Sequence, residues 1–312
     1  MTQREFWLAL ASVEGIGPIR INRLLARFGS VEKVLDAEFS EIARLPLFNP
    51  VLASRVVATR ERLDKFRRQM EWLENQGVEI LCLEDANYPD KLRTISNAPP
   101  VLYKKGKLGE ISRKAIAIVG STQPTEVGVL TTLELSKSLA QAGFTVVSGF
   151  AKGIDTSAHI GALSVGGMTV GVFGGDLFSI YPIENRPLAA QVCKSGMLLS
   201  EHPYSTSPTP ANLILRNRII SGLSIATIVV EARQNGGAVR TASYALEQGR
   251  AVFAYDWQKR YPLSEGPRHL LQRGAIPITL RRLKDIQSRL LNPELFTAQL
   301  RNSSLVEQIE LF

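Results

Sequence analysis

The sequence predicts an α/β fold: an extended Rossmann-like, doubly wound and mainly parallel sheet, preceded by a small helical domain of the helix-hairpin-helix or SAM-like kind. Between residues 115 and 280, short and continuously apolar segments alternate with stretches of helical period, which is typical of buried parallel strands joined by crossover helices. Residues 5–28 show a helical period alone. A length of 312 residues leaves room for two domains.

The composition is that of a globular protein with an excess of basic residues. With 37 Lys and Arg against 29 Asp and Glu, the formal net charge is +8, which favours a polyanionic partner. Two cysteines exclude a disulfide framework and a cysteine-based zinc site. The sequence shows neither a signal peptide nor an apolar run of roughly 20 residues, so we expect a cytoplasmic protein without a membrane span.

The helical domain, residues 1–75, is expected to begin with two short helices on either side of a tight turn. Gly15 and Gly17 tolerate the positive φ of such a turn, and Pro18 suits a first helical position. A fainter copy follows around residues 42–57. The pattern resembles a pair of helix-hairpin-helix units, whose turns can hold a DNA phosphate. We favour a small helical bundle used for packing or dimer contacts, because the second copy has lost its glycines.

A connecting segment, residues 76–108, follows an amphipathic helix over residues 61–76. It is expected to form a strand over residues 78–83 and then an irregular stretch that includes residues 101–103. The Rossmann-like domain is placed at residues 109–280, and a C-terminal helix and tail at residues 281–312.

Seven buried strands are expected in the Rossmann-like domain. Ligands of such sheets bind outside the carboxyl ends of the strands, so the residues that follow each strand are the candidate functional residues. The strands are predicted at residues 115–119, 145–147, 169–173, 197–199, 226–230, 251–254 and 276–279.

Glycine-bearing loops follow the first two strands. Gly120 and Ser121 form a turn ahead of a helix, where backbone N–H groups can meet an anion. The second loop carries Gly149 and Gly153, which let a ligand approach the backbone closely, and Lys152, a mobile positive charge. The spacing matches neither the dinucleotide fingerprint nor a Walker loop, so no cofactor is expected.

Guanidinium groups follow later in the chain. Arg216, Asn217 and Arg218 precede an apolar strand, and two forked donors two residues apart can grip successive phosphates. We expect one of the two arginines to pair internally with Glu201 or Glu231, and the other to face the ligand.

A third glycine turn comes after the strand at residues 226–230. Gly236 and Gly237 can form an anion-binding concavity, with Arg240 at its edge and Thr241 next to Arg240 in the chain. No histidine has companions at metal-ligand spacing, so no metal site is expected.

Taken together, these residues resemble the DprA/Smf family of DNA-processing proteins. The resemblance covers nearly the whole chain in the family's order, and the combination of short motifs is specific although no single motif is. It rests on Pro99-Pro100-Val101, Ile118-Val119-Gly120-Ser121, Gly153-Ile154-Asp155, residues 216–224 and Glu247-Gln248-Gly249-Arg250.

The resemblance implies a homodimeric protein, not an enzyme, that binds single-stranded DNA independently of sequence. It implies DNA processing and recombination of the kind used in natural transformation by competent cells, with loading of RecA onto the strand. The DNA-binding residues assigned on this basis are Gly120, Ser121, Gly149, Lys152, Gly153, Arg216, Asn217, Arg218, Gly236, Gly237, Arg240 and Thr241.

The chain also departs from the family pattern, as a divergent member would. Thr122 stands where the family usually has an arginine after the Gly-Ser turn. Asp256 and Trp257 replace a usual Pro-Gly, and Trp257 with Tyr255 offers stacking surfaces. Residues 281–312 are too short for the C-terminal winged-helix domain that most members carry.

Two alternatives remain open. A nucleotide-binding Rossmann enzyme or sensor would resemble the phosphoribohydrolases, with Asp176 and Glu201 as carboxylates for glycosidic chemistry. Their Pro-Gly-Gly-x-Gly-Thr loop is not reproduced here. An interaction scaffold with a vestigial crevice is the other alternative, and it predicts that loss of Lys152 and Arg218 leaves cellular function intact.

Overall fold

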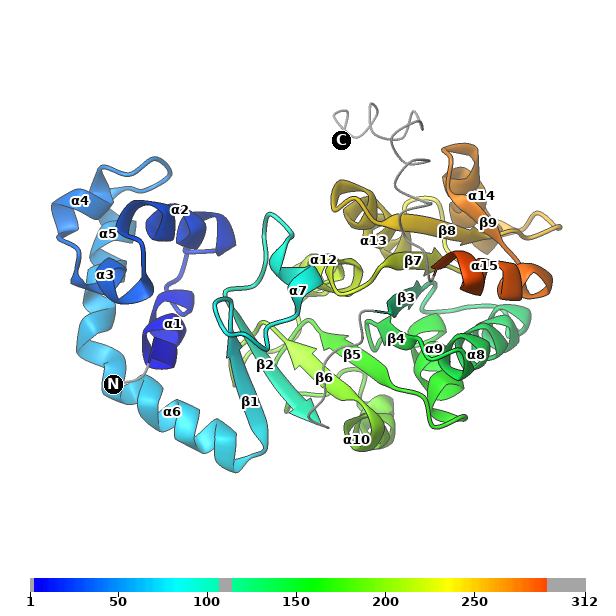
Figure 1. The fold of residues 1–312 in the computed structure, drawn as a ribbon, viewed down its shortest axis with the longest axis horizontal. Helices are drawn as coiled ribbons and strands as arrows, with labels where there is room; N and C mark the ends of the chain where they lie inside the picture. Colours follow the sequence, from blue (N-terminus) through cyan, green and yellow to red (C-terminus); the bar gives the residue numbers. More distant parts are fainter. Residues whose placement is uncertain (1–2, 107–113, 291–312) are drawn as a thin grey trace. The chain divides into compact units, whose positions relative to one another are not determined.

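The computed structural model describes residues 3–106 and 114–290, which form two compact units (Figure 1). The first unit comprises the described residues up to Tyr88 together with Ser96–Lys105. The second comprises Pro89–Ile95 together with the described residues from Gly106 onward. The end of the expected C-terminal tail, residues 291–312, lies outside the described residues. Among the described helices, none is long and apolar enough to cross a lipid bilayer.

The first unit is mainly helical, as the sequence predicts. Arg20 bonds both of the unit's tight turns: it donates from Nη1 to the Gly15 carbonyl at 2.8 Å and from Nε to the Leu47 carbonyl at 2.9 Å. Gly15 and Leu47 both have positive φ, and a proline begins the helix after each turn. The helices are α1 (Gln3–Ala11), α2 (Pro18–Phe28), α3 (Val31–Asp36), α4 (Phe39–Ala43), α5 (Pro50–Val57), the 3₁₀ turn η1 (Ala58–Arg62) and α6 (Leu63–Asn75).

The strand β1 (Val78–Cys82) follows α6 and pairs antiparallel with β2 (Val101–Gly106). The expectation of an irregular stretch through residues 101–103 is therefore wrong. The reason is a cross-strand contact: Lys104 is buried and its Nζ lies 2.9 Å from Oε2 of Glu79, its partner in the register.

The second unit contains a parallel sheet with the strand order β6-β5-β4-β3-β7-β8-β9. From β3 the chain adds strands outward through β4, β5 and β6, and then returns to place β7 on the other side of β3. The strand order thus reverses between β3 and β7, which is where open α/β sheets bind ligands. The bounds are β3 (Ala115–Val119), β4 (Thr145–Ser148), β5 (Thr169–Phe173), β6 (Met197–Ser200), β7 (Ala226–Val229), β8 (Ala251–Tyr255) and β9 (Ile276–Ile278).

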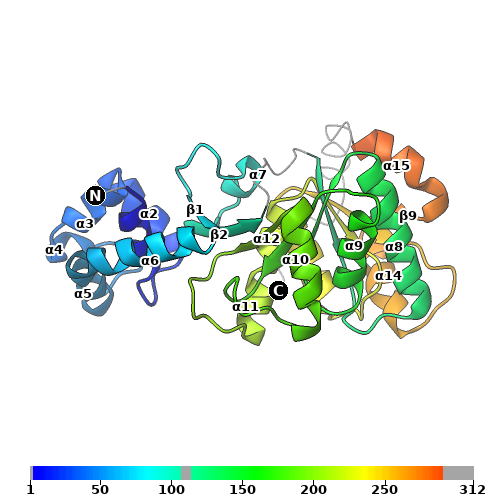
Figure 2. The same cartoon turned by 90° about the horizontal axis from the view of Figure 1, so that it is seen from below.

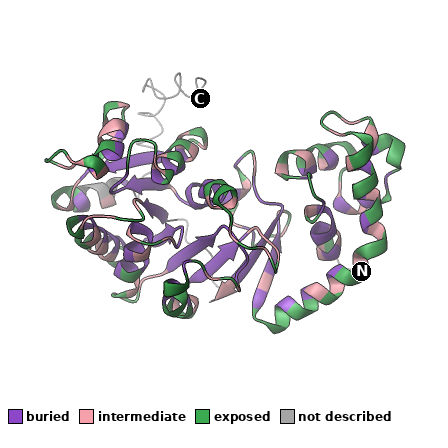
Figure 3. Ribbon diagram, turned by 180° about the vertical axis from the view of Figure 1, so that it is seen from behind, coloured by how far each residue is buried: buried purple, intermediate pink, exposed green. Residues whose placement is uncertain are grey.

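Helices cover both faces of this sheet, so its strands are buried (Figure 3). On one face α8 (Glu126–Gln141), α9 (Ile154–Leu163) and α10 (Arg186–Ser195) pack in a row, and α15 (Leu283–Leu290) packs on α8 (Figure 2). The other face carries α12, α13 and α14. The further helices are α7 (Asp90–Arg93), η2 (Ile183–Asn185), α11 (Pro210–Leu215), α12 (Asn217–Gly222), α13 (Gly237–Glu247), η3 (Pro262–Ser264), α14 (Glu265–Gln272) and η4 (Leu280–Arg282).

Candidate nucleic-acid interface

The carboxyl ends of β3, β4 and β7 meet at the switch point, and the three glycine-bearing loops predicted from the sequence follow these strands. Each loop leads into a helix, α8, α9 or α13. Backbone N–H groups at the start of a helix attract anions, because the helix dipole adds a partial positive charge there.

The first loop is closed against the protein itself. The Ser121 N–H donates to the Glu231 carbonyl at 2.6 Å. A Cβ at Gly120 would lie 2.5 Å from the Ile154 side chain, and a Cβ at Gly153, where φ is +78°, would lie 2.4 Å from the Ser121 carbonyl. These two glycines therefore let the loops after β3 and β4 approach each other, and that close approach accounts for them without a ligand.

The start of α8 is already occupied by a carboxylate. Glu231 is buried, and its side chain accepts from the Thr125 N–H at 2.8 Å, from the Thr125 hydroxyl at 2.6 Å and from the Tyr261 hydroxyl at 2.8 Å. Thr125 is also the N-cap of α8. An internal anion thus holds the position where a bound phosphate would sit. Sequence reasoning missed this role, because the partners of Glu231 lie far from it in the chain.

The loop after β4 is organised by a buried charge pair. The Asp155 carboxylate accepts from the N–H groups of Gly149 at 3.1 Å and Ala151 at 3.4 Å. The Arg216 guanidinium lies over this loop and donates from Nη1 to the Val172 carbonyl at 2.9 Å. A Cβ at Gly149 would come within 1.7 Å of that Nη1. Arg216 is buried, so the expectation that it faces a ligand in the crevice is wrong.

The second guanidinium of the motif is also internal. Arg218 is 1% exposed and forms a bidentate pair with Glu201, with both N–O distances at 2.6 Å. This confirms the prediction that one of the two arginines pairs with Glu201 or Glu231. Planar guanidinium groups form such forked pairs with carboxylates better than lysine does. Both arginines therefore hold elements together inside the fold, through contacts that were not visible in the spacing.

Lys152 lies at the surface of the second loop. Its Nζ is 2.7 Å from Oε1 of Glu184, and both side chains are more than half exposed. A solvent-exposed pair of this kind contributes little to stability and exchanges readily with another anion. Lys152 can therefore form an ion pair with a phosphate once it dissociates from Glu184.

The start of α13 differs from the other two. Its N-cap, Gly236, makes no side-chain capping bond, and no acidic residue lies in its first turn. Gly237 is exposed and has nothing within 4 Å of the position of a Cβ. Arg233 and Arg240, on either side of the turn, are exposed. Of the three helix starts at the switch point, this one is open and flanked by cations.

The remaining predicted residues support this turn from inside. Thr241 is 1% exposed and its hydroxyl donates to the Gly237 carbonyl at 3.1 Å. The side-chain amide of Asn217, also buried, donates to the same carbonyl at 3.3 Å. These contacts fix the orientation of the turn, so Thr241 and Asn217 are positioning residues.

The two carboxylates of the enzyme alternative are both engaged. Asp176 is 1% exposed and accepts from the N–H groups of Phe178 and Ser179 at 2.8 and 2.7 Å. Glu201 is held by Arg218, as described above. Neither carboxylate has the freedom to transfer protons to a substrate, which weakens the case for glycosidic chemistry.

Sequence comparison relates this chain to one protein family. The family model of DNA recombination-mediator protein A matches residues 79–290. The Smf protein of Synechocystis sp. is 35% identical over 278 residues, which are 88% of this chain and 70% of that protein. The DNA processing protein DprA of Bacillus subtilis is 36% identical over 263 residues, which are 82% of this chain and 88% of that protein.

Solved structures agree with the sequence matches. DNA processing protein A from Streptococcus pneumoniae superposes with a TM-score of 0.77 at 29% identity, covering 89% of this chain and 95% of that one. DNA processing protein A from Helicobacter pylori, whose structure describes its single-stranded DNA binding mode, superposes with a TM-score of 0.62 at 27% identity. That match covers 69% of this chain and 96% of the other.

Proposed function

Because the chain belongs to the DNA recombination-mediator protein A family, we propose that it binds single-stranded DNA by the phosphate backbone, independently of base sequence, and makes or breaks no bond. The observation that carries this proposal is the start of α13, which is open at the switch point and flanked by exposed Arg233 and Arg240. A flexible strand can lay a phosphate on such a helix start while it follows the cations of the rim.

The proposed contacts differ in role from one predicted residue to the next. Gly236, Gly237, Arg233 and Arg240 contact the strand directly, and Lys152 joins them when it leaves Glu184. Gly120, Ser121, Gly149, Gly153, Arg216, Arg218, Asn217 and Thr241 act from within, by holding the loops that present these groups. For Gly149, Arg216, Arg218, Asn217 and Thr241 this division follows from burial, since groups without exposed surface cannot reach a phosphate. For Gly120, Ser121 and Gly153 it follows from the close approach of the loops after β3 and β4.

We also propose that the protein acts as a homodimer that processes DNA in recombination and transfers the bound strand to RecA. The resemblance to the family supports this part, together with relatives named as DNA processing proteins. Strand exchange by RecA, measured on coated single-stranded DNA with and without this protein, tests the transfer step.

A charge placed at the start of α13 tests the site. The Gly236 backbone is extended, so Asp and Asn can each accept from the first turn of α13. A Cβ there would lie 3.1 Å from the Arg233 carbonyl, a tight contact that both variants share, so their comparison isolates the charge. Gly236→Asp puts a negative charge where the phosphate would lie, whereas Gly236→Asn supplies a cap of the same shape without charge. We expect the Asp variant to bind a labelled oligonucleotide on the order of tenfold more weakly than the Asn variant, because like charges repel across a contact.

The salt dependence supplies the second measurement. Each phosphate neutralised on single-stranded DNA contributes about 0.7 to the slope of log affinity against log salt. Arg240→Ala should lower that slope by about 0.7 and weaken binding equally for different base sequences. Equal affinities of the two Gly236 variants, together with an unchanged slope for Arg240→Ala, would remove the α13 site from the proposal.

A further inference from the structure

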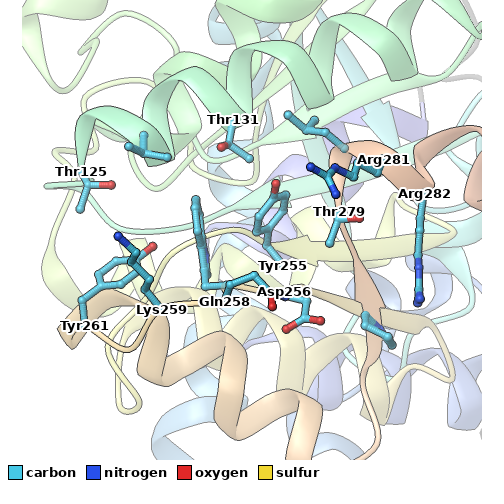
Figure 4. Close-up of a pocket in the computed structure, with 14 residues that line it drawn as sticks. Thr125, Thr131, Tyr255, Asp256, Gln258, Lys259, Tyr261, Thr279, Arg281 and Arg282 are labelled. Carbon is cyan, nitrogen blue, oxygen red and sulfur yellow. The ribbon is translucent and has the colours of Figure 1, made fainter.

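A hollow lies beside the switch point, at the carboxyl ends of β8 and β9 and against α8 (Figure 4). Its volume is about 920 Å³, near the upper end of the roughly 300–1,000 Å³ that small-molecule pockets occupy. Aromatic side chains, three cations and one carboxylate line it, besides the apolar and hydroxyl groups of α8. None of the contacts proposed above involves this hollow.

Three aromatic rings form a row along the hollow. The Tyr255 and Trp257 ring centroids are 4.5 Å apart, and those of Trp257 and Tyr261 are 5.7 Å apart with the rings edge to face. The Trp257 indole N–H donates to the Val230 carbonyl at 2.7 Å, which fixes the plane of the ring. Trp257 and Tyr255 are half-buried, so each keeps surface for a ligand. Fixed aromatic faces of this kind stack nucleobases of any sequence.

Cations lie at both ends of the aromatic row. Lys259 lies beside Tyr261 at one end, and Arg281 and Arg282 lie toward Thr279 at the other (Figure 4). All three are exposed, and none of them forms an ion pair with a side chain that the structure describes. Asp256 is the one carboxylate among the residues that line the hollow. A base stacked in the middle would thus have a positive charge on either side.

The hollow is connected to the switch point by named hydrogen bonds. Tyr261, which ends the aromatic row, donates to Glu231, and Glu231 accepts from Thr125, which also lines the hollow. These bonds tie the wall of the hollow to Glu231, which follows β7, and to the start of α8, within the same unit.

We propose that this hollow takes an unstacked base of the single-stranded DNA, stacked on Trp257, with the flanking phosphates near Lys259 at one end and Arg281 and Arg282 at the other. The inference rests on the proposed function and adds a second subsite to it. A chain segment fits better than a free mononucleotide, because cations at both ends of the row match a phosphate on each side of the base. A duplex is excluded as the ligand, since its bases are stacked on one another.

Tryptophan emission gives a direct test in the full chain. Trp7 is buried and Trp72 is 37% exposed, and both belong to the first unit, so Trp257 is the tryptophan of the hollow. Titration with an oligonucleotide of thymidylate should quench the emission of wild-type protein and of the Trp72→Phe control. The quenching should be lost in Trp257→Phe, which keeps a ring that can stack.

Affinity measurements test the energetic part. Trp257→Ala should bind the oligonucleotide about 5- to 150-fold more weakly, the usual effect of removing a stacking platform. The exposed pair Arg281→Ala/Arg282→Ala avoids any effect on the core and should lower the salt slope by about 0.7, because the two cations share the phosphate on one side of the base. The control for net charge is Arg62→Ala/Arg68→Ala, two exposed arginines of the first unit, which should leave the slope unchanged.

The outcomes separate this inference from the proposed function. If the wild-type protein binds the oligonucleotide but Trp257 emission and the Arg281/Arg282 variant are unaffected, the hollow is not a subsite, and the α13 site stands alone. If deoxyadenosine monophosphate quenches Trp257 as strongly as the oligonucleotide at the same concentration, the hollow is a mononucleotide site and the inference is overturned. If no oligonucleotide binds, the proposed function fails first.

Discussion

Arg216 occupies a space that only a glycine at position 149 leaves open. The guanidinium is buried over the loop after β4, where it holds the Val172 carbonyl and lies near the Asp155 carboxylate. A buried cation of this kind is costly unless every donor finds an acceptor. The two residues therefore form one structural unit, although they are far apart in the sequence.

This arrangement predicts different effects for two glycine substitutions. Gly149→Ala places a Cβ 1.7 Å from Nη1 of Arg216, so the guanidinium must move and lose its carbonyl partner. We expect a loss of about 1–3 kcal/mol or more in the free energy of unfolding, measured in urea. Gly237→Ala meets no atom within 4 Å and serves as the control. It should change stability by less than about 1 kcal/mol, in the stabilising direction.

His159 shows how burial sets a pH dependence. Its Nδ1 lies 2.6 Å from the Thr169 hydroxyl oxygen, which itself donates to the Val146 carbonyl. Nδ1 therefore carries the proton, and Nε2 is buried without a partner among the described residues. Burial, with the nearby charge of Arg216 as a smaller cause, lowers the pKa of His159 to about 3. The imidazole is neutral in the folded protein at all ordinary pH values.

Acid should therefore destabilise the protein through this residue. Below pH 6.5 the unfolded chain takes up a proton on His159 and the folded chain does not, so stability is complete above that pH and is lost as the pH falls toward about 3. Between pH 6.5 and 5 the loss is about 2 kcal/mol. Urea unfolding of wild type and His159→Asn at pH 7 and pH 5 measures it. Parallel behaviour of the two proteins would contradict the assignment of a neutral imidazole.

At the scale of elements, two arginines join the helical hairpins of the first unit: Arg20, and Arg55, which donates to the Glu14 carbonyl at 3.0 Å. The turn between α1 and α2 and the turn between α4 and α5 each present a carbonyl, at Gly15 and Leu47, to the Arg20 guanidinium. The fork geometry of arginine suits two acceptors in different directions, which the single ammonium group of lysine does not. The packing of the two hairpins therefore depends on contacts that neither hairpin contains by itself.

Removing the Arg20 contact should weaken both turns together. Arg20→Ala and Arg20→Lys should each lower the free energy of unfolding by about 1–2 kcal/mol, since two hydrogen bonds to charged donors are lost or weakened. Arg23→Ala, an exposed arginine one turn away, is the control and should stay within about 0.5 kcal/mol of wild type. Equal stability of Arg20→Ala and Arg23→Ala in urea would show that the hairpins pack without this bridge.

At the scale of the whole molecule, the sequence predicts the second unit well. The strands at residues 115–119 and 169–173 match the structure, and the other expected strands of the sheet differ at their C-terminal ends by one residue. Continuous apolar runs between glycine turns identify buried parallel strands with little ambiguity. The strand β2 was missed because Lys104 and Lys105 interrupt its run of apolar residues. The burial of Lys104 is explained only by its ion pair with Glu79.

The candidate site could be located from the sequence but not resolved into roles. Strand ends and glycine loops indicate the edge of the sheet at which the strand order reverses. Which arginine faces outward depends on partners from other strands, namely Val172 for Arg216 and Glu201 for Arg218. Such long-range contacts leave no periodic signal, so the sequence predicted one outward-facing arginine where the structure has both inside.

The carboxylate of Glu231 at the start of α8 has a consequence for the range of possible ligands. A soluble metabolite carrying a diphosphate would approach this corner of the sheet and meet a fixed negative group that it cannot displace, because the group is part of the polypeptide and fully enclosed. A long polymer with regularly spaced charges needs no such corner and can rest elsewhere along the rim. The start of α8 therefore has no room for the phosphate of a small nucleotide, because a carboxylate of the protein itself already accepts the hydrogen bonds there.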